Sequence, residues 1–303
     1  MNHFPFALYD AFSEDAFGGS QAAVISDTKT IGLEQRQRVA REIGMPATVF
    51  IDEVGNDWVT VQFMSTVMEL PMCGHGTICL MTYLLDSEFI RLHSEESRTI
   101  ELRLPNGSAK VSLSQRLDGR FLVMLDIDPP GFKPGPTDRE WVPNTLGVSI
   151  NDLASDLPVE IAVGDFIHLV VPLKSLVAMR SITPDFNGIV EFCDSYGIET
   201  VAVFCREVEN EISTIHVRDF CPAVGVNESA AAGTTNAALT SYLIRHNILQ
   251  ADTSGKIMIH AEQGIEIDRP SLIQSIATLS QDKISRLQVG GIATRVLDGH
   301  VYL

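Results

Sequence analysis

The sequence predicts an α+β fold of two pseudo-symmetric lobes, in each of which a curved, mostly antiparallel sheet wraps around a central helix. Three observations support this prediction. Strand-like segments greatly outnumber helical ones, each half contains one helix that is apolar on nearly every face, and the stretch that begins at Glu69 recurs at Glu228. A helix that is apolar all round is expected to be buried rather than amphipathic. Strands must therefore surround it.

The recurring stretches cover residues 69–85 and 228–244, and each is typical of a strand end, a glycine-containing turn and a buried helix. A shift of 159 residues superimposes Glu69 on Glu228, Gly74 on Gly233, Leu80 on Leu239, Tyr83 on Tyr242 and Leu84 on Leu243. Two copies of one unit predict two similar lobes that face each other. We expect the active site to lie between them.

Alternating and β-branched segments give the expected strands, and 3.6-residue periodicity gives the helices. In the first half, strands are expected at residues 6–12, 22–25, 48–51, 58–64, 100–104, 109–113 and 121–127, and helices at 33–43 and after Thr77. In the second half, strands are expected at residues 159–163, 166–172, 201–205, 213–220, 257–260, 264–268, 287–290, 292–297 and 301–303, and helices at 186–196 and after the Glu228 turn. Residues 128–136 are dense in proline and glycine, which indicates a linker. The predicted lobes are residues 1–128 and 129–303, and the last strand is a candidate to return to the first lobe.

The composition excludes several classes of partner. The 303 residues carry a formal charge of −17, so nucleic acid and anionic membranes would be repelled, whereas a small acid can still bind at a local positive site. The N-terminal Met-Asn-His-Phe-Pro-Phe does not resemble a signal peptide, and no segment has the length of a membrane span. Five cysteines without a C-x-x-C pair argue against a disulfide framework or a zinc site, and favour the reducing cytoplasm.

Cys73 is the first candidate catalytic residue. It precedes Gly74, His75 and Gly76 at the start of the first buried helix, where free backbone N–H groups and the helix dipole favour an anion. Such a field lowers the pKa of a thiol, which would make Cys73 a base for proton transfer. A free cysteine is also often a small buried hydrophobe, and that interpretation stays open. Cys79, Cys193, Cys205 and Cys221 are interpreted as structural.

The turn before the second helix supplies the matching candidates. A substrate carboxylate is expected to bind the N–H groups of Gly74 and His75 in one lobe, and of Gly233, Thr234 and Thr235 in the other. Thr234 is the candidate proton donor on the opposite face, with Ser229 behind it. The fixed dipoles would stabilise the charge that develops beside the carboxylate, so no metal and no cofactor is needed.

Two further side chains have two interpretations each. His75 either donates to the substrate and tunes Cys73, or satisfies a neighbouring backbone group. Glu69 either braces the turn as a hydrogen-bond acceptor, as its repeat at Glu228 indicates, or serves as a reserve acid and base.

These motifs resemble the diaminopimelate epimerase fold and, within it, the phenazine-biosynthesis isomerase-like (PhzF-like) branch, nearly from end to end. The resemblance is carried by residues 10–12 and 17–19, the turn from Glu69 to His75, Gly164 with residues 168–172, residues 218–222 with Gly225, and residues 262–264 with 269–271. Residues 72–76 are also similar to the first motif of proline racemases and hydroxyproline epimerases. The resemblance implies a homodimer and an isomerase.

The sequence also departs from the pattern of this family. The catalytic Glu of its Glu-Thr-x-Phe motif falls on Ala47, and the functional Asp of its second turn falls on Ser229. The second cysteine of the racemising relatives falls on Ala232. A racemase needs comparable groups on both faces, so the sequence favours a one-base isomerase that moves a proton next to the carboxylate of a small amino or hydroxy acid. A dehydratase-type lyase that uses Cys73 on a β-hydroxy acid, and a small-acid binding protein without catalysis, remain alternatives.

Overall fold

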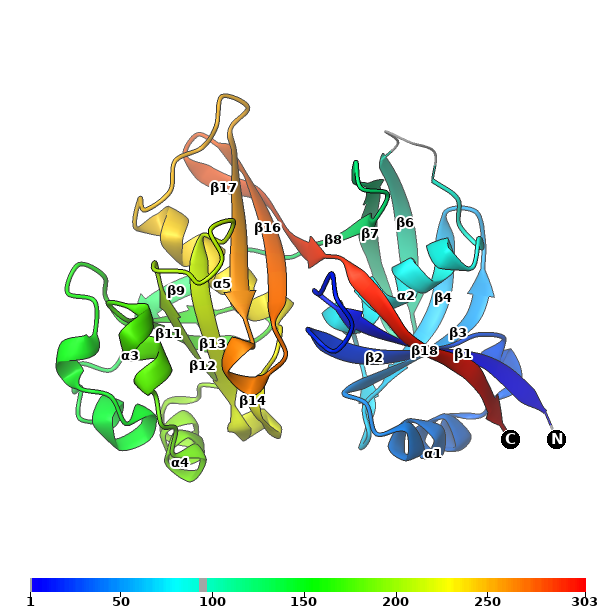
Figure 1. The fold of residues 1–303 in the computed structure, drawn as a ribbon, viewed down its shortest axis with the longest axis horizontal. Coiled ribbons are helices and arrows are strands. Elements are labelled where there is room, and N and C mark those ends of the chain that lie inside the picture. Colours follow the sequence, from blue (N-terminus) through cyan, green and yellow to red (C-terminus); the bar gives the residue numbers. More distant parts are fainter. Residues whose placement is uncertain (1, 93–96) are drawn as a thin grey trace. The chain divides into compact units, whose positions relative to one another are not determined.

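The computed structural model describes residues 2–92 and 97–303, and the chain divides into two units. Unit 1 comprises residues 1–126 and 290–303, and unit 2 comprises residues 127–289 (Figure 1). The chain therefore leaves unit 1 after Asp126 and returns to it at Gly290, so that the last strand belongs to the first unit. No helix among the described residues is both long and apolar enough to span a membrane.

In the described part of unit 1, the strands form a sheet in the order β18-β1-β2-β3-β4-β6-β7-β8, with the short β5 paired to β4. The pairs β2–β3 and β4–β6 are parallel and the others antiparallel. The elements are β1 (His3–Ala11), β2 (Ser20–Ile25), α1 (Leu33–Ile43), β3 (Ala47–Val54), β4 (Trp58–Met64), β5 (Glu69–Leu70), α2 (Gly74–Asp86), β6 (Ser97–Leu104), β7 (Gly107–Gln115), β8 (Phe121–Asp126) and β18 (Ala293–Tyr302).

Helix α2 is the centre of this sheet. It contacts β1, β2 and β3, and also β8 and β18 from the two ends of the strand order, so the strands curve around it. Every residue from Gly76 to Leu85 is buried, as expected for a helix with apolar side chains on all faces. Burial of this helix is worth tens of kcal/mol before the entropy cost of folding, at about 25 cal/mol per Å² of apolar surface.

Unit 2 repeats the strand order of unit 1 as β9-β10-β11-β12-β13-β15-β16, followed along the chain by β17, with β14 paired to β13. Again the two parallel pairs, β11–β12 and β13–β15, occupy corresponding positions. The elements are β9 (Gly131–Pro134), β10 (Glu160–Val163), β11 (Ile167–Pro172), α3 (Leu176–Ser181), α4 (Phe186–Tyr196), β12 (Thr200–Cys205), β13 (Ile215–Cys221), β14 (Val226–Ser229), α5 (Gly233–Arg245), β15 (Lys256–Gln263), β16 (Ser271–Ser280) and β17 (Lys283–Gly291).

The two central helices also begin and end alike. Helix α5 has 13 residues, as α2 does, and is buried from Thr235 to Leu243. At the C-terminal ends, the N–H of Ser87 donates to Tyr83 O at 2.9 Å, and the N–H of His246 donates to Tyr242 O at 3.1 Å. The following residue has a positive φ in both cases. The predicted duplication and the α+β class are therefore confirmed, down to the geometry of the helix ends.

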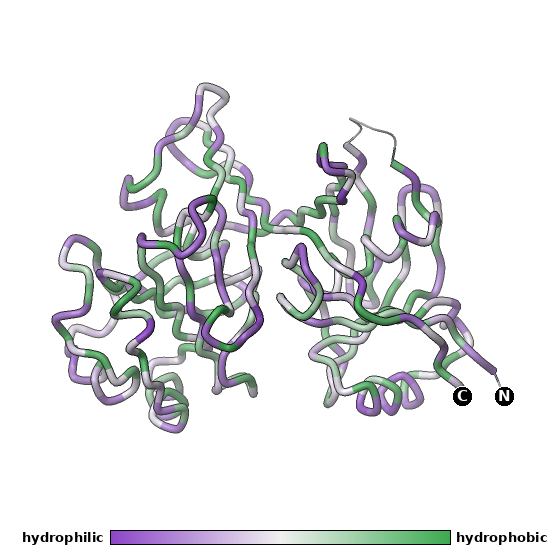
Figure 2. The backbone as a smooth tube through the Cα atoms, viewed as in Figure 1, coloured by the Kyte–Doolittle hydropathy of each residue, from purple (hydrophilic) through white to green (hydrophobic). Residues whose placement is uncertain are grey.

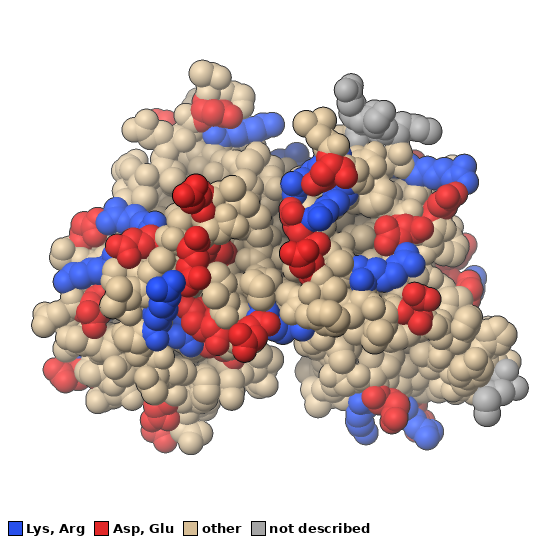
Figure 3. All heavy atoms as spheres, in the orientation of Figure 1, with Lys and Arg blue, Asp and Glu red and all other residues tan. Residues whose placement is uncertain are grey.

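The distribution of hydrophobic and charged residues agrees with the fold. In Figure 2, hydrophilic and hydrophobic residues alternate along the coil of α1. Helix α1 is amphipathic and buries Val39 and Ala40 in a cluster with Phe50 and Met64. The face in Figure 3 carries acidic side chains more densely than basic ones, in agreement with the formal charge of −17.

Three local predictions are wrong. Within the predicted linker at 128–136, residues 131–134 form β9, which pairs with β10. Residues 264–268 are not a strand: Gly264 has φ +76, and the chain turns there into a short 3-10 segment. The strand that pairs with β15 is β16, whose residues carry no strand prediction.

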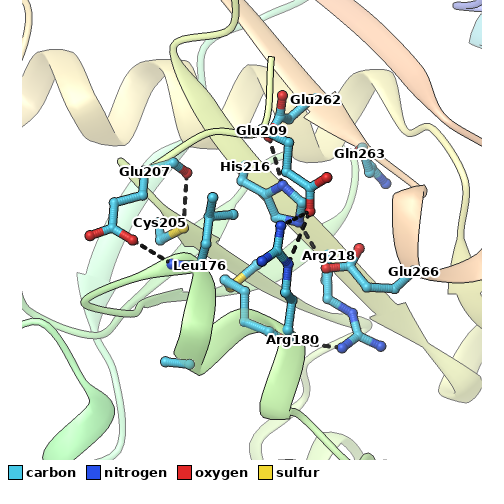
Figure 4. A network of polar contacts seen from close by, with 12 residues as sticks. Leu176, Arg180, Cys205, Glu207, Glu209, His216, Arg218, Glu262, Gln263 and Glu266 are labelled. Atoms are coloured by element: carbon cyan, nitrogen blue, oxygen red, sulfur yellow. Dashed lines mark hydrogen bonds and ion pairs between the residues drawn. The ribbon is translucent and has the colours of Figure 1, made fainter. Parts of the chain in front are cut away.

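A charged network is buried against β13 in unit 2 (Figure 4). His216 is fully buried, its Nδ1 lies 2.8 Å from Glu262 Oε1, and its Nε2 lies 2.9 Å from Glu266 Oε1. The same Glu262 accepts hydrogen bonds from the backbone N–H groups of Glu209 and Asn210 at 2.6 and 2.9 Å. The network therefore fixes the loop after β12 to β13 and β15.

Candidate active site

The first turn presents Cys73 at the start of α2. Cys73 has extended φ and ψ and is the residue that precedes the first helical turn, while its carbonyl accepts from Thr77 N and Oγ1 at 2.9 and 2.8 Å. Its Sγ lies 3.5 Å from Nδ1 and 3.6 Å from Nε2 of His75. Glu69 lies half-buried in β5, opposite Met64. The turn thus brings the sulfur and the imidazole together.

Gly76 allows this close packing. A Cβ atom at this position would lie 3.1 Å from Cys73 Sγ and 3.1 Å from the ring of Phe63, which is closer than ordinary van der Waals contact. The glycine is therefore required by the approach of the sulfur to the helix start, in addition to any contact between its N–H group and a ligand. Gly74, in contrast, has open space around it.

The electrostatics of Cys73 differ from the sequence prediction. Burial raises the pKa of the thiol to about 12, although the backbone N–H of Gly76 acts in the opposite direction. Burial also lowers the pKa of His75 to about 4, so the ring is neutral at pH 7 and supplies no positive charge to the sulfur. The expectation that the helix start lowers the thiol pKa is therefore wrong, because desolvation outweighs the hydrogen bond from Gly76.

The second turn, in unit 2, has the same backbone and different side chains. Ala232 takes the place of Cys73 before α5, and its carbonyl accepts from Asn236 N and Nδ2 at 3.2 and 2.9 Å. Glu228 forms a buried bidentate pair with Arg218 at 2.9 and 2.8 Å. The pair connects β13 to β14 just before the turn. The backbone N–H groups of Gly233, Thr234 and Thr235 lie in the first helical turn, where α-helices have no intrahelical acceptors.

Thr234 and Thr235 have different environments. Thr235 is fully buried, and its hydroxyl donates to Asp219 Oδ2 at 2.8 Å, so its side chain is engaged within the core. Thr234 is half-buried and lines a small pocket of unit 2. Ser229 lies opposite Asp219 on β14, and its carbonyl accepts from Gln263 Nε2 at 2.8 Å. Ser229 and Thr234 are both half-buried, whereas Thr235 is fully buried.

Asp219 is a buried carboxyl that the sequence analysis did not single out. Burial raises its pKa to about 6, although hydrogen bonds from Thr235 and Thr200 lower it. Its Oδ1 has no hydrogen-bond partner in the described part of the chain. The Arg-Asp-Phe sequence does not indicate that Asp219 is buried. Its burial depends on which face of β13 turns toward α5.

We expect Thr235→Val to lower the free energy of unfolding by about 1–3 kcal/mol, because Asp219 loses a buried hydrogen bond. Since that bond favours the ionised carboxylate, the loss should be larger at pH 8 than at pH 5, where Asp219 is protonated. Urea denaturation at the two pH values measures both. The matched variant Thr234→Val should change stability by no more than about 0.5 kcal/mol. Equal losses for the two variants would show that the environments are wrongly assigned.

Ala47 marks the position where the PhzF-like pattern has a glutamate. It is the first residue of β3, is fully buried, and pairs with Ala22 of β2. Alanine supplies no carboxylate at this position. The candidate proton-transfer groups of the first turn are Cys73 and His75.

Comparison with known proteins identifies the family. The family model described as phenazine biosynthesis-like protein (PhzC-PhzF) matches residues 9–299. The chain therefore belongs to this family, and the resemblance found in the sequence is confirmed.

Several curated relatives are named isomerases. The uncharacterized isomerase YddE of Escherichia coli K12 is 26% identical over 288 residues, which cover 94% of this chain and 93% of the relative. The trans-2,3-dihydro-3-hydroxyanthranilate isomerase of Pseudomonas aeruginosa is 27% identical over 305 residues, which cover 98% of this chain and 99% of the relative. The protein is an isomerase-type member of the PhzF family.

Solved structures agree with the fold. A PhzF-family protein of Bacillus anthracis has a TM-score of 0.89 at 20% identity and covers 100% of both chains. A hydroxyproline epimerase of Agrobacterium vitis has a TM-score of 0.60 at 11% identity and covers 99% of this chain and 92% of the other. At these identities the likeness concerns the fold alone.

Proposed function

We propose that the protein is a cofactor-independent isomerase that moves a proton next to the carboxylate of a small amino or hydroxy acid. The observation that carries the proposal is the contact of 3.5 Å between Cys73 Sγ and the ring of His75 at the start of α2. A sulfur, an imidazole and a helix start provide a proton carrier beside an anion site.

The resting thiol is a proton donor rather than a base, because its pKa is about 12. It becomes a base when its proton passes to the ring of His75, which leaves a thiolate beside an imidazolium. The pKa values of about 12 for the thiol and about 4 for the ring oppose this transfer in the free protein, so we infer that the bound substrate must favour the ion pair. The thiolate then takes the proton from the carbon next to the substrate carboxylate and becomes a thiol again. The imidazolium returns its proton to another carbon of the substrate, so that protons and charge balance over the cycle.

The proposed site for the substrate carboxylate is a helix start. The N–H groups of Gly74 and His75 in the first turn of α2 would stabilise the negative charge that develops as the C–H bond breaks. Those of Gly233 and Thr234 in the first turn of α5 are the corresponding candidates in unit 2. Removing one such donor typically costs about 10²–10³ in rate.

The second turn lacks a thiol, since Ala232 stands where Cys73 stands in the first. Racemisation requires comparable groups on two faces of the substrate, whereas a shift of a double bond can use neighbouring groups on one face. The proposed reaction is therefore an isomerisation by the pair of Cys73 and His75. Loss of water from a β-hydroxy acid would use the same first step and is the alternative reaction, for which Thr234 stays the candidate proton donor.

A panel of amino and hydroxy acids incubated in heavy water and followed by proton NMR tests the proposal. We expect at least one compound to exchange its α proton for deuterium and to give an isomer of unchanged mass apart from the deuterium. An unsaturated or keto product would assign the protein to the dehydratases. If compounds of the panel bind and stabilise the protein but none of them exchanges its α proton, the proposal is contradicted. The protein would then be a binding protein without catalysis.

A further inference from the structure

Unit 2 contains a small pocket beside α5. It is lined by Thr234, Ala237 and Ala238 of this helix, by Phe166 and His168 of the β10–β11 hairpin, and by Asp128 and Asp165. The space within it is about 20 Å³, which admits one group of the size of a water molecule. The pocket can therefore take the head of a small ligand.

His168 supplies a polar atom that has no partner. It pairs with Thr200 across the parallel strands β11 and β12, is 2% exposed, and places Nδ1 2.6 Å from Thr200 Oγ1. The other ring nitrogen, Nε2, is buried and makes no hydrogen bond with any described residue. A buried polar atom without a partner is costly, typically about 1–3 kcal/mol. A hydrogen-bond donor that reaches Nε2 would remove this cost.

The surrounding hydrogen bonds determine what Nε2 can bind. The Thr200 hydroxyl has one proton, and the neighbouring Asp219 carboxylate is the stronger acceptor for it. Nδ1 of His168 must then carry the ring proton and donate it to Thr200 Oγ1. The imidazole is neutral at pH 7, because burial lowers its pKa to about 4. Nε2 is therefore a bare acceptor, which requires a hydrogen-bond donor as its ligand.

The charged side chains of the lining favour a positively charged donor, whereas the start of α5 at Thr234 favours a negative group. Asp128 and Asp165 are both exposed, and none of the described residues that line the pocket is a lysine or an arginine. Phe166 adds an aromatic wall, with its ring centroid 6.2 Å from that of His168 and the two planes 27° apart. Ammonium groups bind favourably near aromatic faces, and a primary ammonium head has the size of a water molecule.

We propose that this pocket is a binding site for the protonated amine of a small molecule, with His168 Nε2 as the hydrogen-bond acceptor and Asp128 and Asp165 as the balancing charges. The inference does not depend on the reaction assigned to Cys73, because the pocket lies within unit 2 and its chemistry is complete without the thiol. The amine comes either from a substrate that also carries a carboxylate or from a separate small amine.

Titration with methylammonium chloride at pH 7.5, followed by long-range proton–nitrogen NMR of protein labelled with ¹⁵N in histidine, tests the proposal. His168→Leu identifies the signal of His168. In the free protein we expect Nδ1 to be protonated and Nε2 to be bare. Methylammonium should shift the Nε2 resonance in a saturable way. Tetramethylammonium chloride at equal concentration, which has the same charge but no N–H group and a larger head, should not shift it.

Two variants control for charge. Asp165→Asn should weaken methylammonium binding about three- to tenfold, because the carboxylate is exposed and partly screened. Asp282→Asn removes an equally exposed carboxylate from the β16–β17 turn, where φ is +61 and asparagine is well tolerated, and should have no effect. An Nε2 that already carries a proton, an equal response to both cations, or an Asp165→Asn variant that binds like the original protein would each overturn the proposal.

Glycine and glycolate separate the two sources of the amine. If glycine binds at least tenfold more tightly than methylammonium, the amine belongs to a ligand that also carries a carboxylate. If the two bind equally, the site takes a separate small amine. Glycolate, which lacks the ammonium, should leave the Nε2 resonance unchanged, and a glycolate shift equal to that of glycine would contradict the inference. Solvent exchange at Cys73 is measured separately, so failure of one proposal leaves the other standing.

Discussion

Replacement of His216 by leucine is expected to lower the free energy of unfolding by about 3–5 kcal/mol, the scale observed when one partner of a buried ion pair is removed. His216 is fully buried, and each of its ring nitrogens contacts a carboxylate, of Glu262 and of Glu266. Leucine would leave both carboxylates without their charged partner in the interior. Urea denaturation at pH 6.5 measures the loss.

The effect should depend on pH in a defined direction. Burial alone would lower the pKa of His216, but the hydrogen bonds and charges of Glu262 and Glu266 raise it to about 9. A histidine with a folded pKa above its ordinary value of 6.5 contributes stability that is full below pH 6.5 and is lost as pH rises through about 9. The difference between the original protein and His216→Leu should therefore shrink from pH 6.5 to pH 10.

His246→Leu is the matched control. His246 is half-buried and lies 2.8 Å from one carboxylate, that of Glu160, so its replacement should cost about 1 kcal/mol or less. Similar losses for the two histidine variants, or a difference for His216→Leu that grows toward pH 10, would show that the network does not hold a protonated imidazole.

Alkylation of Cys73 by iodoacetamide is expected to be about 10³-fold slower in the folded protein than in the unfolded chain at the same pH. The thiolate is the reactive species, and a pKa raised from 9.0 to about 12 reduces its population about a thousandfold at any pH below 9. Mass spectrometry of the peptide that contains Cys73, in buffer and in urea, gives the two rates.

The pH profile separates ionisation from simple shielding. If the raised pKa controls the reaction, the rate in the folded protein should rise about tenfold per pH unit between pH 7 and 10 without a plateau. A plateau near pH 7, or alkylation in the folded protein as fast as in urea, would mean that the start of α2 lowers the thiol pKa after all.

Much of the fold could be predicted from the sequence because it depends on local patterns. Helices α1 and α4 have the predicted bounds, Leu33–Ile43 and Phe186–Tyr196, since each combines an apolar stripe with a glycine just after its end. The repeated glycine turns predicted both central helices. In contrast, β9 lies in a stretch rich in proline and glycine, where pairing with β10 overrides the local preference.

The turn at Gly264 shows a second limit. The stretch around Glu262 and Gln263 suggests a tight hairpin, but Gly264 takes a positive φ, and a Cβ there would lie 2.5 Å from Arg269 O and 2.7 Å from Ala230 O. That close approach of two backbone segments depends on the turn before α5. Sequence periodicity carries no information about such a contact.

The candidate site was predictable in its residues and not in its electrostatics. The Cys-Gly-His-Gly order identified the sulfur, the ring and the helix start, all of which lie in one turn. The pKa of Cys73 depends on how deeply the sulfur is buried, and the helix dipole alone suggested the opposite direction. His168 was noticed only as part of a motif, because its unpartnered Nε2 results from the pairing of β11 with β12 and from the position of Asp219.

The most direct test of the proposed chemistry compares the original protein with Cys73→Ser in heavy water, on a compound whose α proton the original protein exchanges. Serine keeps the size and a hydroxyl but cannot form the anion at an accessible pH, so we predict that the exchange rate falls by about 10² or more. Stability, measured in urea, should change little. If Cys73→Ser exchanges the proton as fast as the original protein, the sulfur of Cys73 does not carry the proton and the proposed mechanism is wrong.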